Sequence, residues 1–410
     1  MIIDFRFENF RSYRREARLR MLEHGTVNRI AAIYGPNASG KTTVVHALAV
    51  MRGIVLSSVS MNSTDTLPFQ PFLLSKNNEN DQEGLFEITY SLLTGSVFRY
   101  GFSLNRNEIT SEWLFGYRDL QGCVAGEGEC LFIRDGGDCG GTYQKAKDVF
   151  PRTLPNMLLI AKLDQDNDKM AHDILDWFRN LVIIQAYSDD RLYEYSHKQV
   201  TKGPYRGKIM DLMRFADPTI VSVHEVLADW NEIENPELRQ RLRRNALSHG
   251  LHPAKIEFLR RTSDNGETFV ALPFDETESA GTQKMFCLSG PLADIFEKGY
   301  TMVVDEIDSK FHPALTQKLV SMFADSSVNE KNAQLIVTTH DVELMRCGIL
   351  KPAQVFFCEK NMFGESSLYS LAQFRNSERF TSQEMAEKYL EGIFGAMPSF
   401  DTESEEFFHE

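Results

Sequence analysis

The chain has 410 residues, of which 42% are hydrophobic and 25% are charged, and its formal net charge at pH 7 is −14. This composition is that of a globular protein, and the length accommodates two or three ordinary domains or one large α/β domain with an insertion. The negative net charge excludes a surface coated for sequence-independent phosphate binding, because repulsion from nucleic acid would dominate outside a local basic patch. We therefore expect any nucleic-acid contact to be local.

The sequence also bears on the compartment. The segment from Met1 to Phe10 alternates apolar with charged residues and lacks the apolar core and the cleavage site of a signal peptide. No apolar run approaches the ~18 residues of a membrane span, and the six cysteines form no C-x-x-C pair. We expect a cytoplasmic protein without a membrane partner; a metal site at Cys123, Cys130 and Cys139 is the alternative to ordinary thiols.

The first 150 residues predict strands around one helix. The apolar runs Ile2 to Phe7 and Ile30 to Tyr34 predict strands, and the second run leads through a glycine-rich turn into a helix from Lys41 to about Met51. Alternating segments between residues 85 and 115 are separated by short polar turns, which predicts an antiparallel meander. We assign residues 1–150 to one lobe.

The character of the chain changes at Pro151. Apolar residues then recur at helical spacing, as at Met170 and Ile174 and again from Val226 to Trp230. This spacing predicts a mostly helical insertion over residues 151–265.

Short apolar runs return after the insertion, at residues 269–272, 302–304 and 335–337. Each run precedes polar residues and a helical pattern, which predicts a parallel sheet buried on both faces. We assign residues 266–375 to a second lobe and residues 376–410 to a C-terminal segment with an acidic tail.

A phosphate-binding loop occupies the turn after the second predicted strand. The segment from Gly35 to Thr42 satisfies the pattern G-x-x-x-x-G-K-[ST] between a buried strand and a helix. Its glycines let backbone N–H groups surround the phosphates of ATP, Lys41 reaches the β- and γ-phosphates, and Thr42 ligates Mg²⁺. The residues expected to bind ATP are Gly35, Pro36, Asn37, Ala38, Ser39, Gly40, Lys41, Thr42 and Thr43.

Two carboxylates follow the apolar strand that ends at Val304. Asp305 is expected to hold Mg²⁺, and Glu306 is expected to orient and polarise the attacking water. A strand followed by Asp-Glu is common, so this motif alone does not indicate an ATP site. The phosphate-binding loop upstream is what supports the assignment.

A histidine follows the strand that begins at Gln334. His340, in the segment Thr338-Thr339-His340-Asp341, is expected to contact the γ-phosphate of ATP. An ordinary surface histidine is the alternative, and the order and spacing of the motifs favour the catalytic role.

A fourth motif runs from Glu278 to Gln283, before the strand that ends at Val304. Ser279 lies 26 residues before Asp305 and opens a predicted helix, whose start presents backbone N–H groups and a hydroxyl to an anion. The alternative is that Ser279 only caps the helix.

These motifs, in this order, resemble those of ABC ATPases of the SMC/RecF-like branch, and the segment from Glu8 to Tyr13 looks like the start of that branch. More closely, the chain resembles the bacterial family that includes the RloA and AbiLi abortive-infection proteins and the AriA subunit of PARIS. The segments that carry this resemblance are residues 305–313, 334–340 and 388–398. The resemblance implies an α/β fold, with the parallel sheet core of an ABC ATPase head, an antiparallel β subdomain and a mostly helical insertion.

The resemblance also implies a homodimer or a higher homo-oligomer that assembles head to tail through ATP. In it, Ser279, Ala280, Gly281 and Thr282 of one chain face the γ-phosphate bound by the other chain, and Asp308 belongs to the loop that crosses the interface. The chain departs from the family pattern because Ala280 replaces the first glycine of L-S-G-G-Q.

The glutamine that joins the two lobes at the metal is not evident in the sequence. Gln70 is the best candidate, as a third contact to Mg²⁺ beside Thr42 and Asp305.

Two basic stretches lie in the predicted insertion and are candidates for a nucleic-acid or partner surface. Solvated helix faces are the alternative. The first stretch comprises Tyr193, Tyr195, Lys198, Lys202, Tyr205, Arg206 and Lys208; the second comprises Arg239, Arg241, Arg243, Arg244, Lys255, Arg260 and Arg261.

The sequence and the resemblance together predict an ATPase that acts as a sensor or regulator in bacterial phage defence. We find no nuclease motif outside the ATP site, so the effector, a nuclease by expectation, is assigned to another chain. The alternative is a DNA-repair clamp of the RecF kind that binds DNA directly. The 238 residues between Lys41 and Ser279 are too many for a transporter subunit and too few for the arms of an SMC protein.

Overall fold

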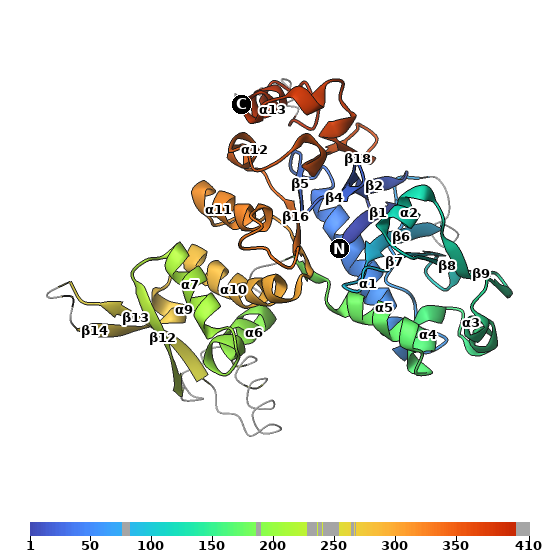
Figure 1. The fold of residues 1–410 in the computed structure, drawn as a ribbon, viewed down its shortest axis with the longest axis horizontal. Helices are drawn as coiled ribbons and strands as arrows, with labels where there is room; N and C mark the ends of the chain where they lie inside the picture. Colours follow the sequence, from blue (N-terminus) through green and yellow to red (C-terminus); the bar gives the residue numbers. More distant parts are fainter. Residues whose placement is uncertain are drawn as a thin grey trace, which may run out of the picture. The chain divides into compact units, whose positions relative to one another are not determined.

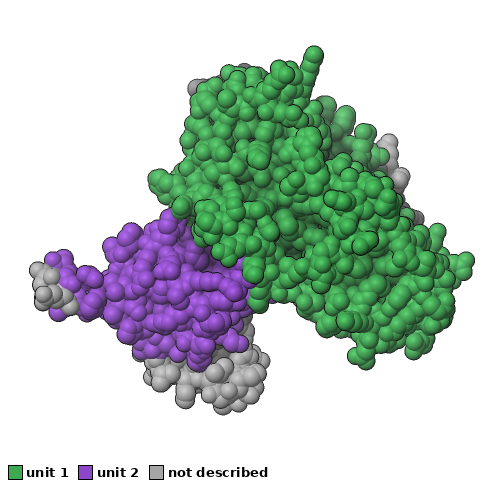
Figure 2. All heavy atoms as spheres, in the orientation of Figure 1, with its two compact units in different colours: residues 1–185, 298–410 green, residues 186–297 purple. Residues whose placement is uncertain are grey.

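The computed structural model describes residues 1–75, 83–185, 190–227, 236, 240, 254–263, 266 and 268–398. Two compact units make up the chain: unit 1 comprises residues 1–185 and 298–410, and unit 2 comprises residues 186–297 (Figure 2). The predicted acidic tail after Pro398 and the basic residues Arg239, Arg241, Arg243 and Arg244 lie outside the described residues.

Unit 1 contains an antiparallel sheet with the strand order β10-β9-β8-β7-β6-β1-β2. The predicted meander is confirmed as β6 to β8, and β1 joins it because its apolar residues alternate inward, as Phe5 and Phe7 show. The strands are β1 (Ile2–Glu8), β2 (Ala17–Arg20), β6 (Gly84–Ser91), β7 (Val97–Leu104), β8 (Ile109–Tyr117), β9 (Glu129–Asp135) and β10 (Asp138–Gly140); β3 (Leu22–Glu23) and β4 (Thr26–Val27) form a small hairpin.

The second sheet of unit 1 has the order β11-β15-β16-β5-β17-β18. The pairs from β11 to β17 are parallel, so the carboxyl ends of these strands meet at one edge, as a predicted parallel sheet requires. Every residue of β5, β15 and β16 is buried. The strands are β5 (Ile30–Tyr34), β11 (Val182–Ile184), β15 (Thr301–Val304), β16 (Gln334–Thr338), β17 (Val355–Lys360) and β18 (Ser366–Ser370).

One core of buried side chains joins both sheets with α1, α4 and α5 (Figure 1). The α-helices of unit 1 are α1 (Lys41–Ser57), α2 (Leu120–Ala125), α3 (Gln144–Val149), α4 (Leu159–Gln165), α5 (Lys169–Arg179), α11 (Pro313–Ala324), α12 (Val342–Arg346) and α13 (Ser382–Leu390). Short 3-10 turns are η1 (Ser58–Ser60), η3 (Phe150–Arg152), η5 (Pro352–Gln354), η6 (Leu371–Gln373) and η7 (Ser377–Arg379).

The segment from Lys41 to Ser60 is long and apolar enough to span a membrane by composition, with a mean hydropathy of 1.5. The expectation that no apolar run approaches this length is therefore corrected. Half of the segment is buried, and Val44, Val45 and Leu48 belong to the core of unit 1, as a core helix requires.

The predicted insertion begins too early. Residues 151–185 belong to unit 1, because α5 buries Ile174 and Phe178 in the same core as α1 and the antiparallel sheet. Tyr90 stacks on Trp177 of α5 with ring centroids 4.0 Å apart. Pro151 therefore marks a turn within unit 1, and the structure divides the chain at residues 186 and 297 instead of 151 and 265.

The described part of unit 2 is mostly helical, but it also contains a sheet that the sequence did not predict. Its helices α6 (Asp190–Thr201), α7 (Arg206–Ala216), α9 (Phe274–Thr277) and α10 (Ala280–Lys298) accompany an antiparallel sheet of β12 (Ile220–Leu227), β13 (Ala254–Arg261) and β14 (Phe269–Pro273). Val226 lies in β12 and not in a helix, and the predicted parallel strand at residues 269–272 pairs antiparallel with β13. In a short segment with one face partly exposed, the pattern of apolar residues does not clearly distinguish a strand from a helix.

Candidate nucleotide-binding site

The phosphate-binding loop has the predicted context, because β5 leads into residues 35–40 and α1 begins at Lys41. Gly35 has a φ of 149°, and a Cβ atom at this residue would lie 2.3 Å from the carbonyl oxygen of Cys358. Gly40 has a φ of 114° and caps α1. These two positions need glycine, since a side chain would meet both steric conflict and backbone strain.

The side chain of Lys41 is buried inside this loop. Its Nζ donates hydrogen bonds to the carbonyl oxygens of Gly35 and Pro36 at 2.7 and 2.9 Å. Burial lowers the pKa of Lys41 below its ordinary value. Phosphate oxygens of a bound nucleotide could replace these carbonyl partners and restore the stability of the charged form.

The two predicted carboxylates follow β15 and are tied to the neighbouring strand β16. The hydroxyl of Thr338 donates to Asp305 Oδ1 at 2.5 Å, and the backbone N–H of Glu306 donates to the same hydroxyl at 2.7 Å. Glu306 has a φ of 50°, a left-handed conformation that is costly for a residue with a side chain. The structure holds this turn through Thr338 and through the Ile307 N–H, which donates to the Thr338 carbonyl at 3.1 Å.

His340 lies at the carboxyl end of β16 and lines the same pocket as Lys41 and Glu306. Burial, followed by the charge of Lys41, lowers the pKa of His340 below its ordinary value. The backbone N–H of His340 donates to Asp308 Oδ2 at 3.2 Å, which connects the loop after β15 to the loop after β16. Asp308 Oδ1 is buried and has no hydrogen-bond partner within the described part of the chain.

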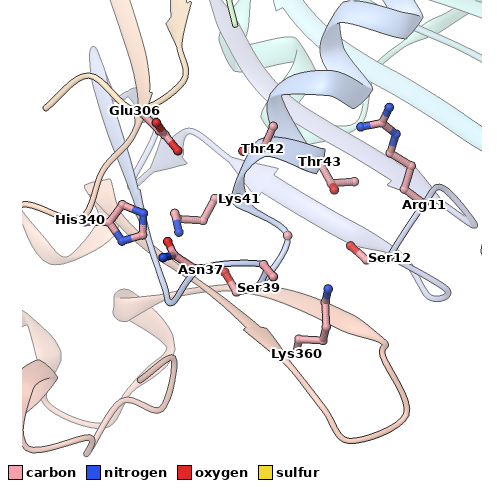
Figure 3. A pocket seen from close by; sticks show the side chains of 12 residues that line it. Arg11, Ser12, Asn37, Ser39, Lys41, Thr42, Thr43, Glu306, His340 and Lys360 are labelled. Atoms are coloured by element: carbon pink, nitrogen blue, oxygen red, sulfur yellow. The ribbon is translucent and has the colours of Figure 1, made fainter. Parts of the chain in front are cut away.

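These elements meet in a pocket of about 260 Å³ (Figure 3). The residues that line it are Arg11, Ser12, Asn37, Ala38, Ser39, Gly40, Lys41, Thr42, Thr43, Glu306, His340 and Lys360. In Figure 3, Glu306 and His340 lie to the left of Lys41, Arg11 and Ser12 lie to its right beyond Thr43, and Lys360 lies below Thr43 and Ser12. A triphosphate placed on the loop would therefore have its γ-phosphate near Glu306 and its nucleoside near Arg11 and Lys360.

Arg11, Ser12 and Lys360 were not predicted as site residues. The backbone N–H and the Nε of Arg11 donate to the carbonyl oxygen and to the Oε1 of Gln70, at 2.8 and 2.9 Å. Arg11 lies in the turn after β1, where the sequence shows no phosphate-binding or catalytic motif. Lys360 is the last residue of β17 and is not part of a motif either. Long-range packing alone brings both of them to the pocket.

Gln70, the predicted third contact to Mg²⁺, does not belong to the described lining of the pocket. Its side-chain oxygen accepts the hydrogen bond from Arg11, so the structure gives Gln70 a role in holding Arg11.

Gln185 lies beside Asp305 in the parallel sheet, although, like Gln70, it does not line the described pocket. It follows β11, and the register that pairs Ile184 with Val304 puts Gln185 beside Asp305, whose N–H donates to the Ile184 carbonyl at 2.9 Å. The Nε2 atom of Gln185 lies 3.0 Å from Nδ1 of His46, one turn along α1 from Thr42. The short apolar run Val182-Ile183-Ile184 before this glutamine is the pattern that predicts a strand. It was not recognised because the segments around it have helical spacing.

A hydroxyl and a carboxylate are oxygen ligands of the kind that Mg²⁺ binds, and Thr42 and Asp305 provide them. The described residues contain no cluster of three or more His, Cys, Asp or Glu side chains that could hold a metal. In nucleotide sites, Mg²⁺ takes most of its ligands from phosphates and water.

The predicted signature segment belongs to unit 2, whereas the pocket residues belong to unit 1. Ser279 precedes α10, and its Oγ accepts a hydrogen bond from the Thr282 N–H at 3.2 Å, so the expected capping role is present. Ser279 and Ala280 are exposed. Glu278 beside them is buried and accepts two hydrogen bonds from Arg260, at 2.7 and 2.8 Å.

The fold and the site define an α/β domain with a phosphate-binding loop between β5 and α1. The chain belongs to the family described as "AAA domain, putative AbiEii toxin, Type IV TA system", whose sequence pattern matches residues 30–127 and 163–346. No curated protein matches the chain.

Several solved structures are similar to the chain at low sequence identity. The SMC head domain from Thermotoga maritima is similar over 90% of this chain and 98% of that chain, with 13% identity and a TM-score of 0.42. The cbiO1 subunit of the ABC transporter complex cbiONQ from Clostridium perfringens is similar over 96% and 97%, with 11% identity and a TM-score of 0.34. The RecF–ATP structure is similar over 90% and 97%, with 12% identity and a TM-score of 0.29.

Proposed function

We propose that this protein binds ATP with Mg²⁺ and hydrolyses it. The observation that carries the proposal is the shared pocket, in which the phosphate-binding loop, Glu306 and His340 lie together. In the proposed step, a water attacks the γ-phosphorus, the bond from that phosphorus to the β–γ bridging oxygen breaks, and Glu306 accepts the proton of the water. Mg²⁺ held by Thr42 and Asp305 would neutralise charge on the phosphates.

We further propose that two copies share each ATP in a head-to-tail homodimer. The exposed start of α10, with Ser279 and Gly281, offers a hydroxyl and backbone N–H groups to the γ-phosphate of a partner chain. Among the described residues, Oδ1 of Asp308 is buried and has no hydrogen-bond partner, which supports a role for Asp308 at the interface. Higher homo-oligomers would build on this dimer.

In the cell, we propose that ATP-dependent assembly regulates a separately encoded effector, a nuclease, in cytoplasmic defence against phage. The description of the family as an AbiEii-type toxin domain of a toxin–antitoxin system supports this reading over general metabolism.

The alternative, a clamp that binds DNA directly, depends on the basic stretches. Within the described part of the chain, many of these residues have internal partners: Arg206 donates to two backbone carbonyls, Lys208 pairs with Glu297, and Arg260 pairs with Glu278. These contacts favour a structural role.

Two measurements test the proposal. The purified chain should hydrolyse ATP in the presence of Mg²⁺, and Lys41→Ala should abolish the activity, whereas Lys318→Ala, at an exposed lysine of α11 outside the pocket, should leave it unchanged. In cells that also carry the neighbouring gene, wild type should reduce phage plaques and Lys41→Ala should not. DNA binding that falls steeply with salt, together with no effect on phage, would instead favour the clamp.

A further inference from the structure

The outer strand of the sheet in unit 2 has an unusual edge. β14 pairs only with β13 among the described strands, so one side of its backbone has no strand partner. Phe269 and Val270 of this strand are 49% and 42% exposed. The described strand carries no charged side chain. Edge strands usually carry charges, bulges or prolines that prevent pairing with another chain, and only Pro273 at the end of β14 has this character.

The register identifies the backbone groups on the open side. The Thr262 N–H donates to the Thr268 carbonyl at 2.9 Å, so these two residues form a hydrogen-bonded pair. Hydrogen-bonded pairs alternate along antiparallel strands, and Val270 therefore directs its backbone groups toward β13. Phe269 and Ala271 direct their N–H and C=O groups outward.

Both faces of the strand present apolar side chains near this edge. Val270 lies on the face of the sheet that carries buried Phe258, and Phe269 lies on the opposite face, with the Arg261 guanidinium 6.0 Å from its ring centroid. A strand with apolar side chains on both faces is typical of a position inside a sheet and not at its rim.

We propose that β14 pairs with β14 of a second copy of this chain in an antiparallel, two-fold arrangement. Val270 faces its counterpart across the axis, and Phe269 of each copy lies opposite Ala271 of the other copy. The two three-stranded sheets then form one continuous sheet of six strands. This inference does not depend on nucleotide and extends beyond the proposed ATP-dependent dimer.

The strand fits itself in this register better than it would fit an arbitrary sequence. Four backbone hydrogen bonds form between Phe269 and Ala271 of the two copies, so every outward N–H of these residues is used. The largest side chain of the strand lies opposite the smallest, and two valines face each other, which are favourable cross-strand pairs. Pro273 has no N–H to donate, which ends the pairing.

Cysteine cross-linking tests the register in the full-length chain. Val270 would occupy a non-hydrogen-bonded pair, whose Cα atoms lie about 4.5 Å apart, and disulfides form at Cα separations of about 4.4–6.8 Å. Val270→Cys should therefore cross-link to itself under mild oxidation, with and without ATP. Ala271→Cys, its exposed neighbour, should do so at least about tenfold more slowly, because residue 271 faces residue 269 of the other copy. The wild type, with its six cysteines, gives the background.

Charge variants provide a second, independent test. Val270→Lys and Val270→Glu should each abolish the larger species in light scattering without nucleotide, because like charges would meet on the axis. An equal mixture of the two variants should restore it. Ala271→Cys cross-linking as fast as Val270→Cys, or charge variants that assemble as the wild type does, would overturn the proposal. Assembly only with a strand of another protein would also overturn it.

Discussion

Thr338 donates a hydrogen bond of 2.5 Å to Asp305 while its hydroxyl accepts the N–H of Glu306. One side chain of β16 therefore orients the proposed metal ligand and fixes the turn that presents the proposed base. It also connects these two carboxylates to His340, two residues further along the chain. The Thr338 hydroxyl therefore connects Asp305 and Glu306, the two carboxylates proposed to act on the γ-phosphate of ATP.

The first prediction follows from this link. Thr338→Val keeps the shape of the side chain but removes the hydroxyl, so Asp305 loses an orienting partner. Loss of such an outer partner typically costs 10–100-fold in metal affinity or activity, and we expect turnover to fall by about tenfold and the Mg²⁺ requirement to rise. Thr338→Ser keeps the hydroxyl and should stay within about twofold of wild type. Equal losses in both variants would point to packing instead.

The second prediction concerns Glu306→Gln. The amide keeps the size of the side chain but cannot accept a proton from water, so turnover should fall by about 100-fold or more. ATP binding, measured by equilibrium titration, should be retained, and light scattering with ATP should show a stabilised dimer or a larger assembly. Glu330→Gln, an exposed residue before β16, serves as the control. Unchanged turnover in Glu306→Gln would show that another group is the base.

The third prediction separates the two glutamines. Gln185→Ala should raise the Mg²⁺ concentration needed for half-maximal turnover, because Gln185 lies beside Asp305. Gln70→Ala should instead weaken ATP binding modestly at unchanged Mg²⁺ dependence, because it releases Arg11 at the nucleoside side of the pocket. If the Mg²⁺ dependence shifts in Gln70→Ala and not in Gln185→Ala, the original assignment of Gln70 is restored.

Contiguous motifs were predictable because their chemistry is local. The residues from Gly35 to Thr42 carry their own turn, and Asp305 and Glu306 follow a strand that is apolar throughout, so both strand-loop contexts were confirmed. The side chains that come from distant segments were not predictable. Arg11 and Lys360 reach the pocket only because β17 pairs beside β5 and the turn after β1 lies against the same loop.

The insertion was predicted less well than the lobes, for a physical reason. The helical spacing of Ile174 and Phe178 predicts a helix, but it does not show which core that helix packs into. In the structure this helix, α5, packs into the core of unit 1. In unit 2, β12 exposes His224, Glu225 and Val226 in succession, so it lacks the clean alternation that marks a strand.

The fourth prediction tests whether the site is shared between chains. Lys41→Ala and Ser279→Arg should each be inactive, because one removes the phosphate contact and the other blocks the signature segment. Mixed in one dimer, they leave one composite site with both wild-type elements, so ATPase activity should recover in part. Lys41→Ala mixed with itself should show no recovery. Failure to recover despite demonstrated mixed dimers would count against a site formed in trans.

The last prediction concerns pH and His340. Burial and the charge of Lys41 lower the pKa of the free imidazole, which favours its neutral form at pH 7. A bound triphosphate adds negative charge beside the ring, which stabilises the protonated form and raises the pKa again.

The complex therefore binds more protons at this site than the free protein does, and linkage requires the affinity for ATP to rise as the pH falls through the two pKa values. The effect of one proton is at most about tenfold in Kd per pH unit. Titration of wild type and His340→Asn between pH 8 and pH 6 measures it, with the ionisation of ATP common to both. A steeper rise in affinity for wild type is expected. Parallel profiles for the two proteins would show that His340 does not sense the phosphate.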